Sequence, residues 1–153
     1  MMDLTIERLL PNDLAKFKEL ILVFEDVFEM ENFKLPHDNH LQRLLNKDTF
    51  FAVVAKINDK VIGGLTIYVL DQYYSEKPLA YIYDLAVLTT HQRKGVGNQL
   101  IKFTNNFCIQ NGFEEVFVQA DKVDEYAIDF YRSTQPTNEE QVVHFYYKFT
   151  NES

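Results

Sequence analysis

The sequence of 153 residues predicts one α/β domain, residues 1–153, with a mixed central β-sheet and helices on both of its faces. Three observations predict this class. β-Rich runs follow one another in the middle of the chain, which indicates an antiparallel meander. A strand at 81–87 is apolar on both faces and leads through a helix to another buried strand at 116–120, which is a β-α-β crossover. Amphipathic helices stand before and after these strands.

The N-terminal third of the chain predicts one strand and two helices. Residues 5–9 alternate between apolar and polar side chains, as a short strand does. Apolar residues recur at spacings of three and four over 14–28, which predicts an amphipathic helix. Leucines over 41–45 mark a second, shorter helix, for which Asp38 is a plausible N-cap.

The meander occupies the middle of the chain. Residues 50–57 form a β-rich run, and Asn58-Asp59 is a hairpin turn signal. Residues 61–70 are the return strand. A polar loop then leads to the strand at 81–87, which we expect at the centre of the sheet because both of its faces are apolar.

The last third alternates helices and strands. Residues 96–107 carry the apolar stripe of a third helix, and Gly112 is placed to end it in the left-handed conformation. The strand at 116–120 follows, and a fourth helix over 124–131 has an aspartate as its cap. Residues 142–149 are apolar and aromatic, which predicts a final strand.

Composition narrows the class of function. The net charge of −8 argues against nucleic acid as a partner and is compatible with a cationic small molecule. No apolar run is long enough to cross a bilayer, and the N-terminus lacks the basic segment of a secretory signal. The one cysteine, Cys108, excludes an internal disulfide and suggests a reducing compartment, so we expect a cytoplasmic protein.

A loop with two glycines, residues 92–97, separates the central strand from the third helix. A helix N-terminus presents unpaired backbone N–H groups and the positive end of the helix dipole. Glycines there let the backbone approach an anion, and Arg93 and Lys94 add positive charge. A pyrophosphate is therefore the natural ligand. The loop matches neither the Walker motif nor the dinucleotide-binding motif, which need other glycine spacings.

Through the pattern Gln-x-x-Gly-x-Gly at 92–97, the chain resembles the GNAT superfamily of N-acetyltransferases, whose pyrophosphate motif is Gln/Arg-x-x-Gly-x-Gly/Ala. Within that superfamily it is most similar to the type I aminoglycoside 3-N-acetyltransferases, the gentamicin acetyltransferases. This finer resemblance rests on residues 81–87, on residues 118–121 followed by Asp124, Ala127 and Tyr131, and on His144-Phe145. It extends over about residues 10–149.

The resemblance implies the GNAT fold, in which the central strand splays from its neighbour, and acetyl-CoA as co-substrate. Leu85, Ala86 and Val87 fall at the splay, where backbone groups would bind the pantetheine arm and polarise the thioester carbonyl. The pyrophosphate would be held by Gln92, Arg93, Lys94, Gly95, Val96, Gly97 and Asn98. Tyr131 falls at the position of the superfamily tyrosine that can protonate the departing CoA thiolate. The alternative for Tyr131 is an aromatic ring packed under the sheet.

Acetyl transfer to an amine needs a proton acceptor, because most amines are protonated at neutral pH. Asp84 is the first candidate, since it precedes the splayed segment in an apolar strand, where an unpaired carboxylate is costly to bury. Equally open is a structural carboxylate, paired with a backbone N–H or a basic side chain. Asp121, at the end of the next strand, is the second candidate. Asp124 and Glu125 could bind the cationic acceptor, although Asp124 could also serve only as a helix cap.

These inferences predict direct transfer of acetyl from acetyl-CoA to a primary amine of a cationic small molecule, in a ternary complex without a metal or a covalent enzyme intermediate. The resemblance makes the 3-amino group of an aminoglycoside the leading acceptor, and antibiotic resistance the implied role. Departures from the type I pattern at Val123, Tyr126 and 132–136 keep a polyamine or peptide amine open as acceptor. A non-catalytic acyl-CoA-binding module is a further alternative. Asp84 and Tyr131 argue against it, because a protein that only binds acyl-CoA needs neither a base nor an acid. Related enzymes are commonly dimers, so a homodimer is open as well.

Overall fold

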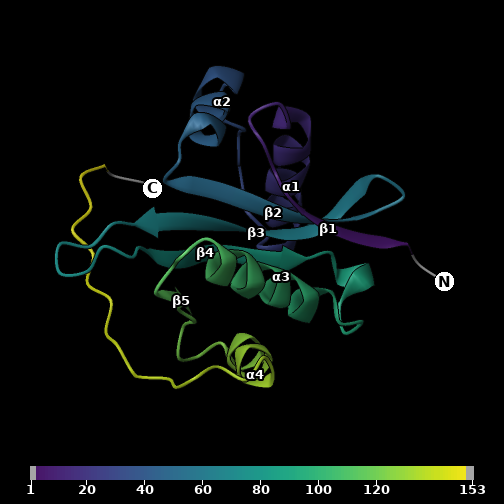
Figure 1. Ribbon diagram of the computed structural model, residues 1–153. Coiled ribbons are helices and arrows are strands. Elements are labelled where there is room, and N and C mark those ends of the chain that lie inside the picture. The colour runs from purple at the N-terminus through teal and green to yellow at the C-terminus, as the bar shows by residue number, and fades with distance from the viewer. Residues whose placement is uncertain (1–2, 151–153) are drawn as a thin grey trace. The chain divides into compact units, whose positions relative to one another are not determined.

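The computed structural model describes residues 3–150 and divides into two compact units, the first ending at Gln119 and the second beginning at Ala120. The first unit contains a five-stranded sheet in the order β1-β2-β3-β4-β5 (Figure 1). Neighbouring strands are antiparallel, except that β4 and β5 are parallel. The strands are β1 (Leu4–Arg8), β2 (Phe50–Ile57), β3 (Lys60–Leu70), β4 (Leu79–Val87) and β5 (Glu115–Val118). The predicted meander and the β-α-β crossover are both confirmed.

Helices cover both faces of this sheet. Helices α1 (Leu14–Val27) and α2 (Asp38–Asn46) lie on one face, and α3 (Val96–Gln110) lies on the other (Figure 1). Alternation along β2 explains this, because successive side chains of a strand point to opposite faces. The ring of Phe50 lies 5.7 Å from that of Phe17 in α1, and the ring of Phe51 lies 5.1 Å from that of Phe107 in α3. The α/β class with helices on both faces is therefore confirmed.

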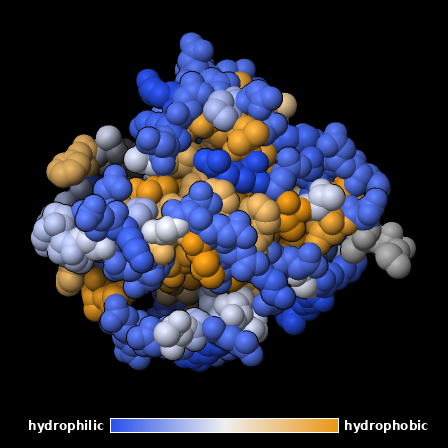
Figure 2. Space-filling model, in the orientation of Figure 1, coloured by the Kyte–Doolittle hydropathy of each residue, from blue (hydrophilic) through white to orange (hydrophobic). Residues whose placement is uncertain are grey.

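The core beneath α1 and α2 is apolar. Leu20 of α1 and Leu41 of α2 are almost completely buried, together with Phe50, Ala52 and Val54 of β2. The outer side of α2 is exposed, and Figure 2 shows mostly hydrophilic side chains at the top of the view, where α2 lies in Figure 1. Within residues 3–150, every helix is too short or too polar to span a lipid bilayer.

Turn residues behave as their chemistry predicts. Asn58 and Asp59 have φ of +52° and +63°, the left-handed pair of a two-residue hairpin between β2 and β3. Gly112 follows α3 with φ of +76°, the conformation expected for the glycine that ends the helix. These local signals therefore determine the connections between neighbouring elements.

The predicted final strand at 142–149 is wrong. The second unit contains helix α4 (Glu125–Ser133), and its residues 136–149 form neither a helix nor a strand. A strand needs a neighbouring strand that pairs with its N–H and C=O groups, and the described residues of this unit contain no other strand. The side chains of Phe145, Tyr147 and Phe149 are accordingly exposed.

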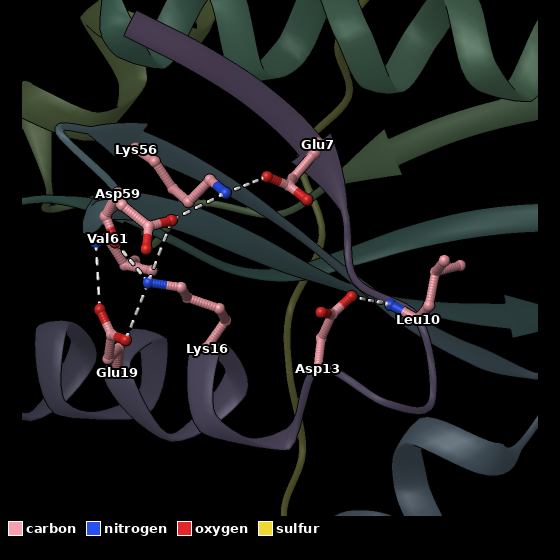
Figure 3. Close-up of polar contacts among 8 residues, drawn as sticks. All are labelled: Glu7, Leu10, Asp13, Lys16, Glu19, Lys56, Asp59 and Val61. Carbon is pink, nitrogen blue, oxygen red and sulfur yellow. Dashed lines mark hydrogen bonds and ion pairs between the residues drawn. The ribbon is translucent and has the colours of Figure 1, made fainter.

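Charged contacts attach α1 to the turn between β2 and β3 (Figure 3). The Lys16 ammonium lies 3.2 Å from the Glu19 carboxylate and 3.6 Å from that of Asp59. The other oxygen of Glu19 accepts a hydrogen bond from the Val61 backbone N–H at 3.2 Å. Lys56 lies 3.5 Å from Asp59. Each exposed ion pair contributes only about 0–1 kcal/mol, so we assign the network to the placement of α1 rather than to overall stability.

We expect Gly64→Ala to lower the free energy of unfolding by about 3 kcal/mol, because β3 passes close under α1 at this residue. A Cβ on Gly64 would lie 2.5 Å from the Val53 carbonyl oxygen and 2.6 Å from a Leu20 methyl group. The carbonyl is held in the β2–β3 ladder and cannot retreat. Urea denaturation measures the change. At Gly112 a Cβ would meet nothing within 4 Å, so Gly112→Ala should cost only about 1–2 kcal/mol for its positive φ. Equal losses would contradict the packing explanation.

Candidate active site

Strands β4 and β5 separate partway along β4. Their parallel pairing joins residues 79–82 to residues 115–118 and ends at Ile82. β4 itself continues to Val87, where it remains paired with β3. On the β5 side, residues 83–87 therefore have no strand partner within the described chain. This is the splay expected at Leu85, Ala86 and Val87, and it leaves an edge of backbone that a ligand can approach.

The loop after β4 ends at an open helix N-terminus. A short 3-10 turn, η1 (Thr89–His91), precedes Gln92, whose side-chain N–H donates to the Val87 carbonyl at 2.8 Å and so ties the loop to β4. Gly95 is the N-cap of α3 with φ of +84°, and it has no side chain that could accept the first N–H groups of the helix. A Cβ on Gly95 would meet nothing within 4 Å.

The charges around this helix N-terminus favour an anion. Arg93 and Lys94 are exposed beside it, and the first turn of α3 contains no acidic residue. The backbone N–H groups of the first turn, the helix dipole and two cationic side chains all favour an anion. The residues present therefore fit a phosphate or pyrophosphate group.

A β-bulge re-aims the side chains near the splay. Thr66 of β3 pairs with Asp84, whereas Ile67 pairs with Ile82, so Tyr83 is an extra residue in β4. In a regular strand, two consecutive side chains point to opposite faces. Here Tyr83 and Asp84 both line one cavity of about 370 Å³ beside α1 and α2. The bulge thus delivers a carboxylate from a central strand into a cavity.

The cavity is mostly apolar, and Asp84 is its one acidic side chain. Its walls contain no lysine or arginine and are formed by Phe17, Ile21, Phe24, Met30, Phe33, Pro36, His40, Leu41, Leu44, Phe50, Thr66, Tyr68, Tyr83 and Asp84. Burial raises the pKa of Asp84 above that of an ordinary aspartate. Among residues 3–150, no backbone N–H or basic side chain pairs with this carboxylate. A carboxylate in this state accepts a proton more readily than an exposed one.

The remaining predicted residues lie in the second unit. Asp124 caps α4, because its carboxylate accepts the Ala127 N–H at 3.1 Å. Asp121 accepts the Val123 N–H at 3.3 Å. Glu125 is the first residue of α4, and Tyr131 lies in its last turns. What these four residues do toward an acceptor or a thiolate stays a prediction.

Tyr68 and Tyr83, the aromatic walls beside Asp84, were not among the predicted site residues. Tyrosines recur on two strands of the predicted meander, but this recurrence alone does not show that their side chains meet. Their meeting depends on which residues pair across β3 and β4, and that register is set by the bulge. No local pattern in the sequence predicts this bulge.

The splayed mixed sheet and the glycine loop at its end are the features of a transferase that uses acyl-CoA. A model of the acetyltransferase (GNAT) family matches residues 16–135. The chain therefore belongs to the GNAT acetyltransferase family, and its fold is the GNAT fold. A search among curated protein sequences found no match.

Solved structures share this fold over nearly the whole chain. The aminoglycoside acetyltransferase meta-AAC0020, from an uncultured soil metagenomic sample and in complex with sisomicin, is 65% identical with a TM-score of 0.95. That match covers 96% of this chain and 97% of the other. The aminoglycoside acetyltransferase HMB0005, also from an uncultured soil metagenomic sample, is 33% identical with a TM-score of 0.90 and coverages of 97% and 100%. A ribosomal-protein-alanine N-acetyltransferase from Brucella melitensis biovar Abortus 2308 shares the fold at 17% identity, with a TM-score of 0.81 and coverages of 97% and 99%.

Proposed function

We propose that this chain is an aminoglycoside N-acetyltransferase that transfers acetyl from acetyl-CoA to the 3-amino group of its acceptor. The observation that carries the proposal is the half-buried Asp84 carboxylate, unpaired among the described residues, in a cavity without lysine or arginine. Such a carboxylate both attracts an ammonium group and can take its proton. The similarity to a sisomicin-bound relative at 65% identity supports an aminoglycoside, and the net charge of −8 favours a polycation.

Acetyl-CoA is the second substrate and brings the activated acetyl group as a thioester. We assign its pyrophosphate to the N-terminus of α3, because the N-cap residue there is a glycine without a capping side chain and Arg93 and Lys94 lie beside it. The binding residues in this assignment are Gln92, Arg93, Lys94, Gly95, Val96, Gly97 and Asn98. We assign the pantetheine arm to the backbone of Leu85, Ala86 and Val87, which lies beyond the end of the β4–β5 pairing.

The proposed chemistry is one direct transfer. Asp84 accepts a proton from the acceptor ammonium, and the freed nitrogen lone pair attacks the thioester carbonyl carbon. The nitrogen–carbon bond forms, the carbon–sulfur bond breaks, and Tyr131 gives a proton to the departing thiolate. The nitrogen then loses its second proton to solvent, which returns a proton to the Tyr131 phenolate, so the products are a neutral amide and CoA thiol. Asp121 is the second candidate for the base, and Asp124 and Glu125 attract further ammonium groups of the acceptor. The reaction needs no metal and no acetylated side chain.

We further propose that residues 1–153 work as one N-acetyltransferase domain, because the family match includes residues of both units. The single cysteine fits a protein of the reducing cytoplasm. A homodimer, common among related enzymes, is compatible with the proposal, which does not depend on it.

A second acceptor class is favoured by the walls of the cavity. Phe24, Phe33 and Leu44 present hydrocarbon rather than hydrogen-bonding groups. An aliphatic polyamine has methylene groups that suit such walls better than the hydroxyl groups of a sugar do. An acetyltransferase for a polyamine or a peptide amine is therefore the alternative function.

We expect rapid release of CoA thiol when the protein is mixed with acetyl-CoA and either gentamicin or sisomicin. The same assay contains spermidine, a short peptide and a blank without acceptor. Release with spermidine or the peptide alone would replace the aminoglycoside by the alternative acceptor class. Binding of acetyl-CoA without turnover on any acceptor would contradict the enzyme and favour a binding module.

A further inference from the structure

We propose that Tyr68 and Tyr83 form, together with Asp84, an aromatic binding site for the ammonium group of the acceptor. The proposal rests on the proposed function and deepens it, because it names residues that select a protonated amine. Two rings provide the walls of the site, and the carboxylate provides its charge. Neither tyrosine reacts, so both are binding residues.

The register of the sheet puts these groups on one face. Thr66 and Tyr68 are two residues apart on β3, so their side chains point to the same side of the sheet. Asp84 pairs with Thr66 across the strands, so its side chain points to that side as well. Without the bulge, Tyr83 would point to the opposite face from Asp84. With it, both residues line the cavity that Tyr68 also lines. The bulge therefore creates the combination of rings and carboxylate.

The rings are held in place before any ligand arrives. The Tyr83 ring meets the Tyr68 ring edge to face at 5.6 Å and the Tyr81 ring at 5.8 Å. Tyr81 stacks on Phe117 of β5 at 4.7 Å, and Tyr68 meets Phe50 of β2 at 5.2 Å. A row of aromatic side chains thus crosses four strands. Because each ring contacts another, binding costs less side-chain entropy than it would with isolated rings.

The electrostatics of the site favour a cation. An aromatic face carries partial negative charge and attracts ammonium groups. The Tyr68 hydroxyl stays neutral, because burial, with Tyr83 and Asp84 nearby, raises its pKa. No lysine or arginine lines the cavity, and His40 is its one side chain that can carry a positive charge. An organic cation in the cavity therefore meets two tyrosine rings and one carboxylate.

A quaternary ammonium ion separates this recognition from the chemistry. Tetramethylammonium has no N–H to donate and no lone pair to attack a thioester, so it cannot be acetylated. Ring faces and a carboxylate still attract it, because neither contact requires a hydrogen-bond donor. We therefore expect it to inhibit competitively against the amine acceptor and not against acetyl-CoA.

The test compares initial rates with sisomicin for four variants. We expect Tyr83→Leu to raise KM for sisomicin about two- to fivefold, with a smaller change in kcat and no change in KM for acetyl-CoA. Tyr68→Leu should act in the same direction, and Tyr83→Phe, which keeps the ring, should recover most of the affinity that leucine loses. Tyr73 lies fully exposed on the β3–β4 loop outside the cavity, so Tyr73→Leu is the matched control and should leave KM unchanged. Inhibition by tetramethylammonium should weaken in Tyr83→Leu.

Two results would overturn the cation site while sisomicin is still acetylated. One is an unchanged KM in both leucine variants, and the other is absence of competition by tetramethylammonium. In either case the proposed function stands, and the proposal of an aromatic cation site is rejected. If no aminoglycoside is acetylated, the proposed function fails instead, and calorimetry of tetramethylammonium on wild type and Tyr83→Leu decides the site alone. Equal heats in the two proteins would then overturn it.

Discussion

Asp84→Asn should lower kcat/KM for the amine acceptor by about 10²–10⁴-fold while leaving the affinity for acetyl-CoA unchanged. The amide has the shape of the carboxylate and cannot take the proton of an ammonium group. Steady-state kinetics and acetyl-CoA titration measure the two effects separately. Asp71→Asn, the same change at an exposed aspartate after β3, is the control and should have wild-type activity.

The same variant should not lose stability, and this distinguishes a proton acceptor from a structural carboxylate. Burial raises the pKa of Asp84, so the folded state binds its proton more tightly than the unfolded state does. At neutral pH the ionised carboxylate therefore costs stability, whereas the uncharged amide of the variant avoids this cost. We expect the unfolding midpoint of Asp84→Asn to equal or exceed that of wild type at neutral pH. Any gain should vanish as the pH falls below the ordinary aspartate pKa of 3.8, where both states are protonated.

The pH dependence of kcat/KM provides a second test of whether Asp84 acts as the base. In the wild type, kcat/KM should fall as the pH drops through the raised pKa of this carboxylate, because the protonated form cannot act as a base. The variant should lack that limb. A fully active Asp84→Asn would mean that Asp121 or water, and not Asp84, accepts the proton. A clear loss of stability of Asp84→Asn at neutral pH would instead indicate that Asp84 is a structural carboxylate.

Gly95→Asp should weaken acetyl-CoA binding by about 10²–10³-fold, because it places a carboxylate against the proposed pyrophosphate. The matched control is Gly95→Asn, which has the same shape, tolerates the left-handed conformation at φ of +84° and carries no charge. An aspartate at an N-cap position also accepts the helix N–H groups, so the fold should remain stable while the anion site is lost. Titration with acetyl-CoA measures both variants, and thermal unfolding verifies that each is folded.

An acetyl-CoA affinity of Gly95→Asp equal to that of wild type would contradict the assignment of the phosphate loop. A loss confined to the aspartate variant that also diminishes at high salt would support it, since salt screens the interaction of exposed charges.

Local signals allowed most of the fold to be predicted from the sequence. The spacing of apolar residues placed α1 and α3, and the Asn58-Asp59 turn placed the hairpin between β2 and β3. These features depend on residues a few positions apart. The strand expected at 142–149 is absent because an apolar and aromatic run becomes a strand only where a partner strand pairs with it.

The candidate site was predictable in part for the same reason. A lone carboxylate in an apolar strand singled out Asp84, and the glycines singled out the loop before α3. Whether Asp84 is paired, and whether it shares a cavity with Tyr83, depends on the register between β3 and β4. A bulge of one residue changes which side chains face the cavity, and register arises from contacts between distant parts of the chain.

The most direct test of the central claim is to identify the product formed from sisomicin and acetyl-CoA. Mass spectrometry counts the acetyl groups added, and two-dimensional NMR of the purified product assigns the acetylated nitrogen. The account predicts a single acetyl group on the 3-amino nitrogen, formed with one equivalent of CoA thiol. Sisomicin recovered unmodified, under conditions in which acetyl-CoA binds, would contradict it.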